Sequence, residues 1–371
     1  MSDSGARGFY TLDGTVTQVY VPADGTHRPD PKPADEVELG AITRHPSAIL
    51  WKNPEGALVD IGDGTALYEF RSKANALGTT VMEGLEEAID RVENDAGLRG
   101  LVVANEGKNF SVGANLMEVA AALKEGRLDK LDHFLMRFQQ VVQRVRYAAK
   151  PVVVAVHQRA LGGGCEIAMA SPHPVVCAEA YLGLVELGVG LIPAGTGTTR
   201  LAQMASDSAP NGFASEIQGA INKLFETVAA ARVSSSGPEA ITLGYLPAST
   251  TIVMNSDRRI HVARSKVVQL SEAGYRPPPR RRFTVLGRPG GATLEAAAYN
   301  YLEGRFISPY DYYLAKRLAY VLTGGGLSGA QEVDEDYVIG LEREVFLELL
   351  QRKETQDRIE HMLKTGKPLR N

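Results

Sequence analysis

The sequence predicts an α/β fold that continues into a mainly helical C-terminal region. Two patterns carry this prediction. Between residues 57 and 178, short apolar segments of strand character alternate with segments of helical periodicity. After about residue 250, charged segments of helical periodicity dominate. The 371 residues are too many for one minimal core and fit about two domains of ~150 residues each.

The first half of the chain supplies the strands and helices of the α/β region. Residues 57–61 and 66–70 are short apolar segments around Gly62-Asp63-Gly64, a combination typical of a hairpin. Apolar residues recur at helical spacing in residues 79–92 and 134–145. Three apolar or β-branched runs predict buried strands: residues 98–104, 151–156 and 174–178.

The C-terminal part is predicted to be mainly helical. Residues 257–273 and 334–363 have the charged, amphipathic character of helices, whereas Arg, Pro and Gly prevent residues 276–290 from forming one regular element. Ser308-Pro309-Tyr310-Asp311 is a helix start with a serine cap and a carboxylate three residues later. That helix is predicted to end near residue 322, before Gly324-Gly325-Gly326.

The N-terminal 47 residues are predicted to be mostly irregular. They contain one candidate strand, residues 16–21, followed by a stretch rich in Pro, Asp and Gly that indicates an extended arm. The expected organisation is therefore an N-terminal arm (1–50), an α/β domain (51–248) and a helical C-terminal domain (249–371).

Composition excludes several classes of function. The net charge of −4 does not favour binding to nucleic acid or to an anionic membrane. The two cysteines, Cys165 and Cys177, form no disulfide framework, and no Cys/His spacing predicts a metal site. No run of about 18 apolar residues predicts a membrane span. We expect a cytoplasmic protein.

Two glycine-containing loops could direct backbone amides at a ligand. Residues 110–116 follow one predicted strand, and residues 160–166 follow another and contain Gly162-Gly163-Gly164. Uncovered amides at the start of a helix attract negative charge, and two amides from separate loops could stabilise a thioester oxygen as it becomes an enolate. The triplet lacks the ending of a phosphate loop and the spacing of a dinucleotide fingerprint. A tight strand-to-helix turn is the alternative.

Two carboxylates lie close to these loops in the sequence. Glu166 falls just inside the helix that the triplet opens, and Glu186 lies in an apolar stretch, where a carboxylate is costly unless it is paired or functional. Capping or a salt bridge is the alternative for Glu186. Two carboxylates that converge on one water could hold it, take its proton and return a proton to carbon.

These segments together resemble the crotonase (enoyl-CoA hydratase/isomerase) superfamily. The resemblance rests on Ala160-Leu-Gly-Gly-Gly-Cys-Glu166, on Gly183-Leu-Val-Glu-Leu-Gly-Val-Gly-Leu-Ile-Pro193, on the 110–116 loop and on Lys73-Ala-Asn-Ala-Leu77. It covers roughly residues 55–245, and Glu186 follows Glu166 by 20 residues, as the glutamates do in hydratases of the family. The resemblance implies a crotonase-type ββα spiral core.

The resemblance also implies a role for each site residue. Ala114 and Gly163 would donate the oxyanion-hole amides, and Glu166 and Glu186 would activate water and deliver the α-proton. The remaining residues would bind the acyl-CoA substrate: Ser72, Lys73, Ala74, Gly113 and Gly162. No metal and no separate cofactor are implied, since CoA is part of the substrate.

The flanks resemble the C-terminal part of bacterial bifunctional 3-hydroxyacyl-CoA dehydrogenase/enoyl-CoA hydratase chains. They include residues 274–282, 308–311 and 366–371, and the arm resembles the tail of the dehydrogenase. No NAD site is expected in this chain. A homo-oligomer, and a partnership with a dehydrogenase, are expected.

Three functions stay open from the sequence. Hydration of 2-enoyl-CoA in fatty-acid β-oxidation is favoured over isomerisation or another crotonase-type reaction of an acyl-CoA, because isomerases of the family often use one carboxylate. A non-catalytic acyl-CoA-binding subunit is disfavoured, because buried carboxylates would serve no purpose there. Gln158, Pro172 and Thr196 depart from the family pattern and put loop geometry in question.

Three further groups invite a functional interpretation. For His157 we favour a structural hydrogen bond over general-base catalysis. Cys165 has no histidine within the motif to activate it, so a buried core residue is favoured. For Arg280-Arg281-Arg282, contact with CoA phosphates is weighed against a solvated or packing surface, which is favoured.

Overall fold

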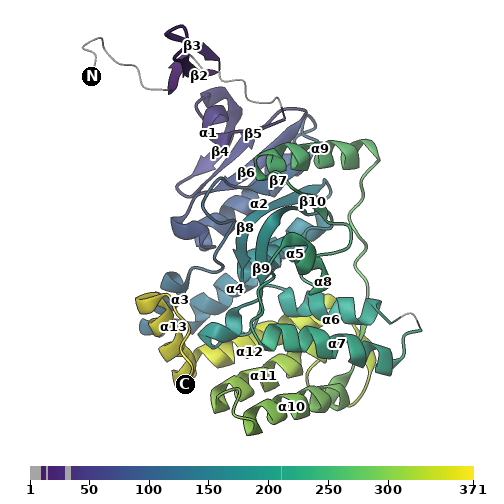
Figure 1. Ribbon diagram of the computed structural model, residues 1–371. Helices are drawn as coiled ribbons and strands as arrows, with labels where there is room; N and C mark the ends of the chain where they lie inside the picture. The colour runs from purple at the N-terminus through teal and green to yellow at the C-terminus, as the bar shows by residue number, and fades with distance from the viewer. Residues whose placement is uncertain (1–9, 14–15, 30–34, 210) are drawn as a thin grey trace.

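A seven-stranded mixed sheet organises the molecule (Figure 1). The computed structural model describes residues 10–13, 16–29, 35–209 and 211–371. The pairings from β4 to β6 are antiparallel, and those from β6 to β10 are parallel. In spatial order the strands are β10 (Thr251–Val253), β9 (Val175–Gly183), β8 (Val152–Leu161), β7 (Gly100–Ala104), β6 (Thr65–Phe70), β5 (Gly56–Asp60) and β4 (Ile49–Asn53).

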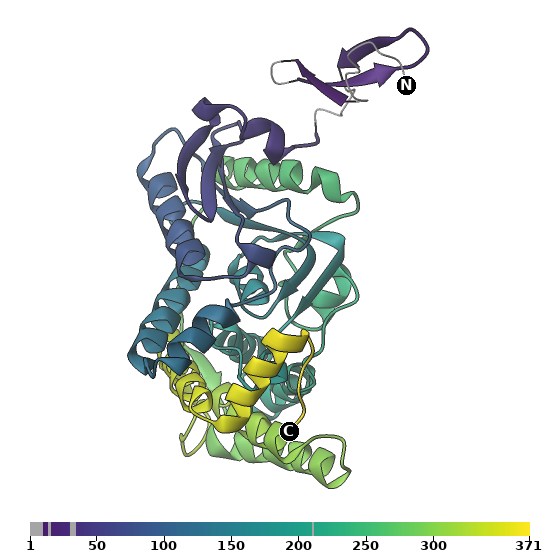
Figure 2. The same ribbon diagram turned by 90° about the vertical axis from the view of Figure 1, so that its left-hand side faces the viewer.

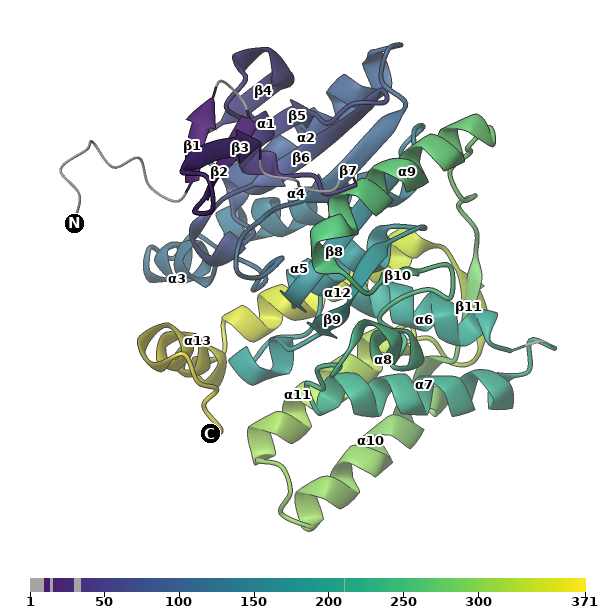
Figure 3. The same cartoon turned by 45° about the horizontal axis from the view of Figure 1, so that its top comes forward.

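Alternate residues of the central strands serve two different cores. In β7, Leu101 and Val103 face the larger core, which includes residues of α2 (Thr79–Asn94), α4 (Leu128–Tyr147) and α5 (Gly163–Ala170). Val102 and Ala104 face a second core under α9 (Arg259–Glu272), which lies across the other side of the sheet (Figure 3). Because both faces are covered, these strands are apolar throughout rather than alternating.

The predicted strands and helices of the α/β region are present, and several are longer than predicted. The strand predicted at 151–156 extends to Leu161, and the strand predicted at 174–178 extends to Gly183. The pairing of β8 with β9 shifts register between Val156 and Gln158, where Gln158 has φ 46°. Because of this irregularity, β8 continues beyond the end of its apolar run. The periodicity of the sequence does not predict that extension.

The remaining helices pack below the sheet in Figure 1. Ser308 and Asp311 form the predicted capping box at the start of α11, which ends at Leu322 as predicted. The helices are α6 (Gly197–Asp207), α7 (Ala214–Ala229), α8 (Gly237–Thr242), α10 (Gly287–Glu303), α11 (Pro309–Leu322), α12 (Glu335–Leu350) and α13 (Lys353–Thr365), with α3 (Leu116–Lys124) beside α13. A short sheet pairs β11 (Phe283–Val285) with β12 (Gln331–Val333).

One prediction for the C-terminal part needs correction. The boundary predicted at 248–249 is wrong, because β10 pairs with β9 in the main sheet and α9 packs on that sheet, so the helical layer begins near α10. The helical region predicted at 334–363 is present as two helices, α12 and α13, which separate at Gln351 and Arg352. None of the helices in the described ranges is long and apolar enough to cross a membrane.

The N-terminal part is more ordered than predicted. The candidate strand at 16–21 is β2 (Val16–Val21), and it pairs with β1 (Tyr10–Asp13) and β3 (Thr26–Pro29) in a small antiparallel sheet that stands apart in Figure 2. The short helix α1 (Leu39–Ile42) joins the main body, since Leu39 is buried and its amide donates to Glu106 Oε1 at 2.8 Å. Residues 1–9 and 30–34 of the predicted arm lie outside the described residues.

Candidate active site

A largely apolar cavity of about 560 Å³ brings the predicted catalytic residues together. Gly113, Ala114, Gly162, Gly163, Glu166 and Glu186 all line it. Apolar walls come from α3, α4 and the segment between β9 and α6. The C-terminal helices also contribute, through Phe346 of α12 and Met362 of α13. Residues far apart in the sequence therefore form one pocket.

The loop around Ala114 is fixed by pairing with a neighbouring segment. The Leu77 amide donates to the Gly113 carbonyl at 2.8 Å, and the Asn115 amide donates to the Leu77 carbonyl at 3.1 Å. In such a parallel bridge the carbonyl before Ala114 and the amide after it both point toward Leu77. The Ala114 amide belongs to the same peptide group as the Gly113 carbonyl, so it points the opposite way. Backbone geometry thus leaves this amide available to a group in the cavity.

The glycine triplet places a second amide beside the first. Gly163 is the first residue of α5, so its amide belongs to the helix end that lacks internal acceptors. A side chain on Gly163 would come within 2.9 Å of Phe138, and one on Gly164 within 2.6 Å of Ser111. A Cβ on Gly113 would lie 3.5 Å from the Gly163 nitrogen, so the two loops are in contact. Glycine is required there because the loops approach so closely.

Glu166 is a buried carboxylate with two backbone donors. The amides of Gly195 and Gly197 donate to Oε1 at 2.7 and 2.8 Å. The side chain is 3% exposed. Burial raises the pKa of Glu166 to about 7, against the lowering effect of the two amide hydrogen bonds. Its charge is therefore partly supported by the turn that precedes α6.

Glu186 lies opposite, at the start of the 3-10 helix η3 (Glu186–Val189). Its Oε2 is buried and has no hydrogen-bond partner among the described residues. Burial, followed by the charge of Glu166, raises the pKa of Glu186 well above its usual range. A Cβ on Gly162 would lie 3.0 Å from Oε1 of Glu186, which places this carboxyl directly beside the glycine triplet.

The two carboxyls therefore have different environments within one pocket. Glu166 has donors that favour the ionised form, whereas the unpartnered oxygen of Glu186 favours the protonated form. Such a pair can take a proton at one position and give a proton at another. The arrangement is suited to adding or removing the elements of water next to a carbonyl group whose oxygen meets two amides.

A third buried carboxylate, Glu342 of α12, lies close to this pair. It accepts hydrogen bonds from the turn that also holds Glu166. Burial and the charge of Glu166 raise the pKa of Glu342 to about 8. Glu342 was missed by sequence reasoning. It lies 143 residues after Thr199, so no local motif connects the two residues. The only signal in the sequence is an acidic residue at a position where the helical pattern expects an apolar one.

The predicted substrate segment adjoins the oxyanion loop rather than lining the cavity. Ser72 precedes the 3-10 helix η2 (Lys73–Asn75), and its hydroxyl donates to the Ala76 carbonyl at 2.6 Å. Ala74 has φ 56°. None of Ser72, Lys73 and Ala74 is among the cavity-lining residues, so their proposed contact would be with the part of a ligand outside the cavity.

The remaining candidates have structural partners. The Nε2 of His157 bonds to the Gly107 carbonyl at 2.6 Å, and burial lowers its pKa to about 4. Burial raises the pKa of the Cys165 thiol well above its usual range. Arg280 stacks over the Tyr147 ring, Arg281 pairs with Asp207, and Arg282 donates to the Glu332 carbonyl. The packing interpretation is therefore favoured for all of them.

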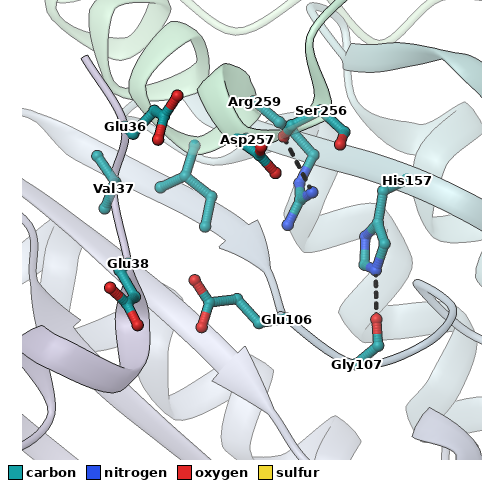
Figure 4. Close-up of a pocket in the computed structure, with 10 residues that line it drawn as sticks. Glu36, Val37, Glu38, Glu106, Gly107, His157, Ser256, Asp257 and Arg259 are labelled. Atoms are coloured by element: carbon teal, nitrogen blue, oxygen red, sulfur yellow. Dashed lines mark hydrogen bonds between the residues drawn. The ribbon is translucent and has the colours of Figure 1, made fainter. Parts of the chain in front are cut away.

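A second cavity, of about 520 Å³, lies on the α9 side of the sheet. Figure 4 shows Arg259 and His157 on one side of it and Glu36, Glu38 and Glu106 on the other. None of the predicted catalytic residues lines this cavity. No cluster of His, Cys, Asp or Glu in the described part of the chain is arranged to hold a metal ion.

The known proteins that this chain resembles point to one family. The enoyl-CoA hydratase/isomerase family matches residues 65–216. A Bacillus subtilis protein named Probable 3-hydroxyacyl-CoA dehydrogenase is 36% identical over 373 residues, which cover 100% of this chain and 46% of that protein. A second B. subtilis protein, named Probable enoyl-CoA hydratase, is 41% identical over 128 residues, covering 34% of this chain and 48% of that protein. The chain thus spans about half the length of these curated relatives.

Solved structures share the fold. An enoyl-CoA hydratase from Bacillus halodurans superposes with a TM-score of 0.54 at 16% identity, covering 82% of this chain and 99% of that one. An enoyl-CoA hydratase/isomerase from Xanthobacter autotrophicus gives 0.53 at 18% identity, covering 85% and 95%. The predicted crotonase-type core with additional helices is confirmed by these similarities.

Proposed function

Because the chain belongs to the crotonase (enoyl-CoA hydratase/isomerase) superfamily, we propose that it adds water across the double bond of a 2-enoyl-CoA thioester. The observation that carries the proposal is a pair of carboxyls at an apolar cavity that two loop amides also line: Glu166 is buried, and Glu186 is half-buried with a buried Oε2. A binding protein has no need for two desolvated carboxyls of unequal environment, since removing a carboxylate from water lowers stability.

The proposed reaction assigns a different task to each carboxyl. Glu166, whose ionised form is supported by two amides, takes a proton from water while the water oxygen bonds to C3 of the substrate. The electrons move to the thioester oxygen, which the amides of Ala114 and Gly163 stabilise as an enolate. Glu186, held protonated by its apolar burial, delivers a proton to C2. A proton returned from Glu166 to Glu186 through solvent restores the starting state.

The apolar part of the cavity is proposed to hold the acyl chain. Leu135 and Phe138 of α4, together with Phe346 and Met362 of the C-terminal helices, give this part its surface. Ser72, Lys73 and Ala74 are proposed to contact the CoA portion, because their segment is hydrogen-bonded to the Gly113-Ala114 loop at the cavity edge. CoA belongs to the substrate, and no separate cofactor is proposed.

A spectroscopic assay with crotonyl-CoA tests the proposal against its alternatives. The purified chain should remove the absorbance of the conjugated thioester as water adds. Absorbance that stays constant despite measurable CoA-ester binding would reject hydration and support a binding subunit. Conversion of a 3-enoyl substrate alone would identify an isomerase instead, which a single competent carboxyl could support.

A role in fatty-acid β-oxidation, beside a dehydrogenase, is a further part of the proposal. It is supported by the names of relatives, among them a Rickettsia felis protein named Putative fatty acid oxidation complex trifunctional enzyme, 24% identical over 86% of this chain. A 3-hydroxyacyl-CoA mixed with NAD and this chain should give no NADH, because the sequence has no dinucleotide fingerprint after a strand. NADH formation would contradict this part.

A further inference from the structure

Glu342 is a buried carboxylate that the proposed reaction does not use. It lies on α12 and is 0% exposed. Its Oε2 accepts from the Thr196 amide at 2.9 Å, and its Oε1 accepts from the Thr199 amide at 2.6 Å and the Thr199 hydroxyl at 2.8 Å. Three donors on one carboxylate make a fixed geometry rather than a chance contact.

The turn that Glu342 holds is the same turn that holds Glu166. The amides of Gly195 and Gly197 donate to Glu166, and the amide between them, that of Thr196, donates to Glu342. Neighbouring peptide groups of one turn thus point alternately at two carboxylates. Thr196 has φ 82°, a strained conformation for a β-branched residue, which needs support from its surroundings.

The contact between Glu166 and the turn is close enough to be sensitive to small shifts. A Cβ on Gly195 would lie 2.5 Å from Oε2 of Glu166, and one on Gly197 would lie 2.7 Å from Oε1. The carboxyl therefore sits between two glycines with little spare room. If Thr196 moves, the peptide groups on both sides of it move as well, and the two amides lose their alignment on Oε1.

Helix α12 is itself anchored, so Glu342 is a firm support for the turn. Near the start of the helix, Glu335 pairs with Arg200 and accepts from the Tyr147 hydroxyl at 2.6 Å. Gln139 of α4 donates to the Ala194 carbonyl at 2.8 Å and to the Ile339 carbonyl at 3.2 Å, which ties α12 to the residue just before the turn.

We infer that Glu342 is a positioning residue for Glu166: it fixes residues 195–199 so that the amides of Gly195 and Gly197 converge on one oxygen of Glu166. The inference rests on the proposed function only for the part that Glu166 plays in catalysis. The hydrogen-bond geometry itself is independent of any substrate.

The test is the titration of the Glu166 carboxyl in the Glu342→Gln variant. A glutamine keeps the volume and one acceptor for Thr199 but turns an NH₂ group toward the Thr196 amide, so two donors oppose each other. The ¹³C resonance of Glu166, assigned with Glu166→Gln, should titrate about one pH unit higher than in the parent, because hydrogen bonds to the ionised form are weakened. An unchanged or lower midpoint would overturn the inference.

The charged groups around Glu342 predict a second change in the same titration. Glu342 is coupled by charge to both Glu166 and Glu186, so loss of its charge alone would lower both midpoints. If loss of the aligned amides dominates at Glu166, its midpoint rises while that of Glu186 falls. The nearest described cation of α6, Arg200, is paired with Glu335 and keeps that partner in the variant. Opposite shifts of the two catalytic carboxyls are the expected signature, and parallel shifts would contradict it.

Glu335→Gln is the matched control. It changes a buried carboxylate of the same helix and removes an ion pair, but it touches no amide of residues 195–199. It should lower the unfolding temperature and move the Glu166 midpoint much less than Glu342→Gln does. A control that shifts Glu166 as much as Glu342→Gln does would show that any weakening of α12 has the same effect, and would overturn a specific role for Glu342.

A milder variant and an activity measurement complete the design. Thr199→Val removes only the hydroxyl bond to Glu342, so a smaller upward shift of Glu166 is expected even if Glu342→Gln fails to fold. No shift in either variant would overturn the inference. With crotonyl-CoA, kcat should fall about tenfold in Glu342→Gln with little change in KM. If the parent chain shows no hydration, the proposed function fails, whereas the titration still decides the role of Glu342.

Discussion

At the residue scale, two side chains of the same chemical type, Glu166 and Glu186, have different environments. Glu166 is buried and Glu186 is half-buried with a buried Oε2, and removal from water raises the pKa of both carboxyls. Two amides support the charge of Glu166, while one oxygen of Glu186 is left without a partner within the described chain. The sequence predicts that both residues matter but not which one carries the proton, because the donors come from Gly195 and Gly197, outside the motif of Glu166.

The pH dependence of hydration follows from these shifts. Glu166 must be ionised to accept a proton from water, and its pKa is raised to about 7, so kcat/KM should rise with pH through about pH 7. Glu186 must be protonated, so activity should fall again at higher pH. Initial rates with crotonyl-CoA from pH 5 to 10 check this expectation. A rising limb near pH 4.5 would indicate an unperturbed base and contradict the assignment.

At the scale of single elements, the sequence predicts what local pattern controls. The capping box of α11 and the hairpin around Gly62-Asp63-Gly64 are present as predicted, because cap and turn chemistry act within a few residues. The extension of β8 and the division of residues 334–363 into two helices were not predicted. They depend on pairing with β9 and on packing of α12 and α13 against distant segments.

Strand β8 carries a strained residue that offers a stability test. Gln158 is exposed and has φ 46°, a conformation that favours glycine, and it is one of the positions that depart from the family pattern. Gln158→Gly should stabilise the protein by up to about 1 kcal/mol in thermal or urea unfolding. Arg159→Gly, at the next exposed strand position without positive φ, should instead destabilise it by about 0.5–1 kcal/mol. Equal effects of both changes would argue against strain at Gln158.

At the scale of the whole molecule, the C-terminal helices support the segments that carry both proposed catalytic carboxyls. Glu342 of α12 holds the turn that binds Glu166. On α13, Arg358 donates to the Leu187 carbonyl at 3.0 Å and the Thr355 hydroxyl donates to the Gly190 carbonyl at 2.6 Å, which fixes the segment that begins with Glu186. These contacts join residues more than a hundred positions apart, so local sequence patterns could not predict them.

The same helices should influence the choice of substrate. Met362 lines the cavity, whereas its neighbour Leu363 is 43% exposed. Met362→Ala widens the apolar end of the cavity. Accommodating one more methylene of the acyl chain is worth about 1–3 kcal/mol in transition-state binding, so the ratio of kcat/KM for a longer enoyl-CoA to that for crotonyl-CoA should rise about tenfold. Leu363→Ala should leave the ratio unchanged. An identical ratio in parent and Met362→Ala would place the acyl chain elsewhere.

The most direct test of the central claim is the hydration rate of crotonyl-CoA in the parent, Glu166→Gln, Glu186→Gln and the double variant. Each single change should lower kcat by about 10²–10⁴ while the protein remains folded. The double variant should lose little more, because the two carboxyls act as one unit on one water. Parent-like hydration in either single variant would contradict the two-glutamate mechanism.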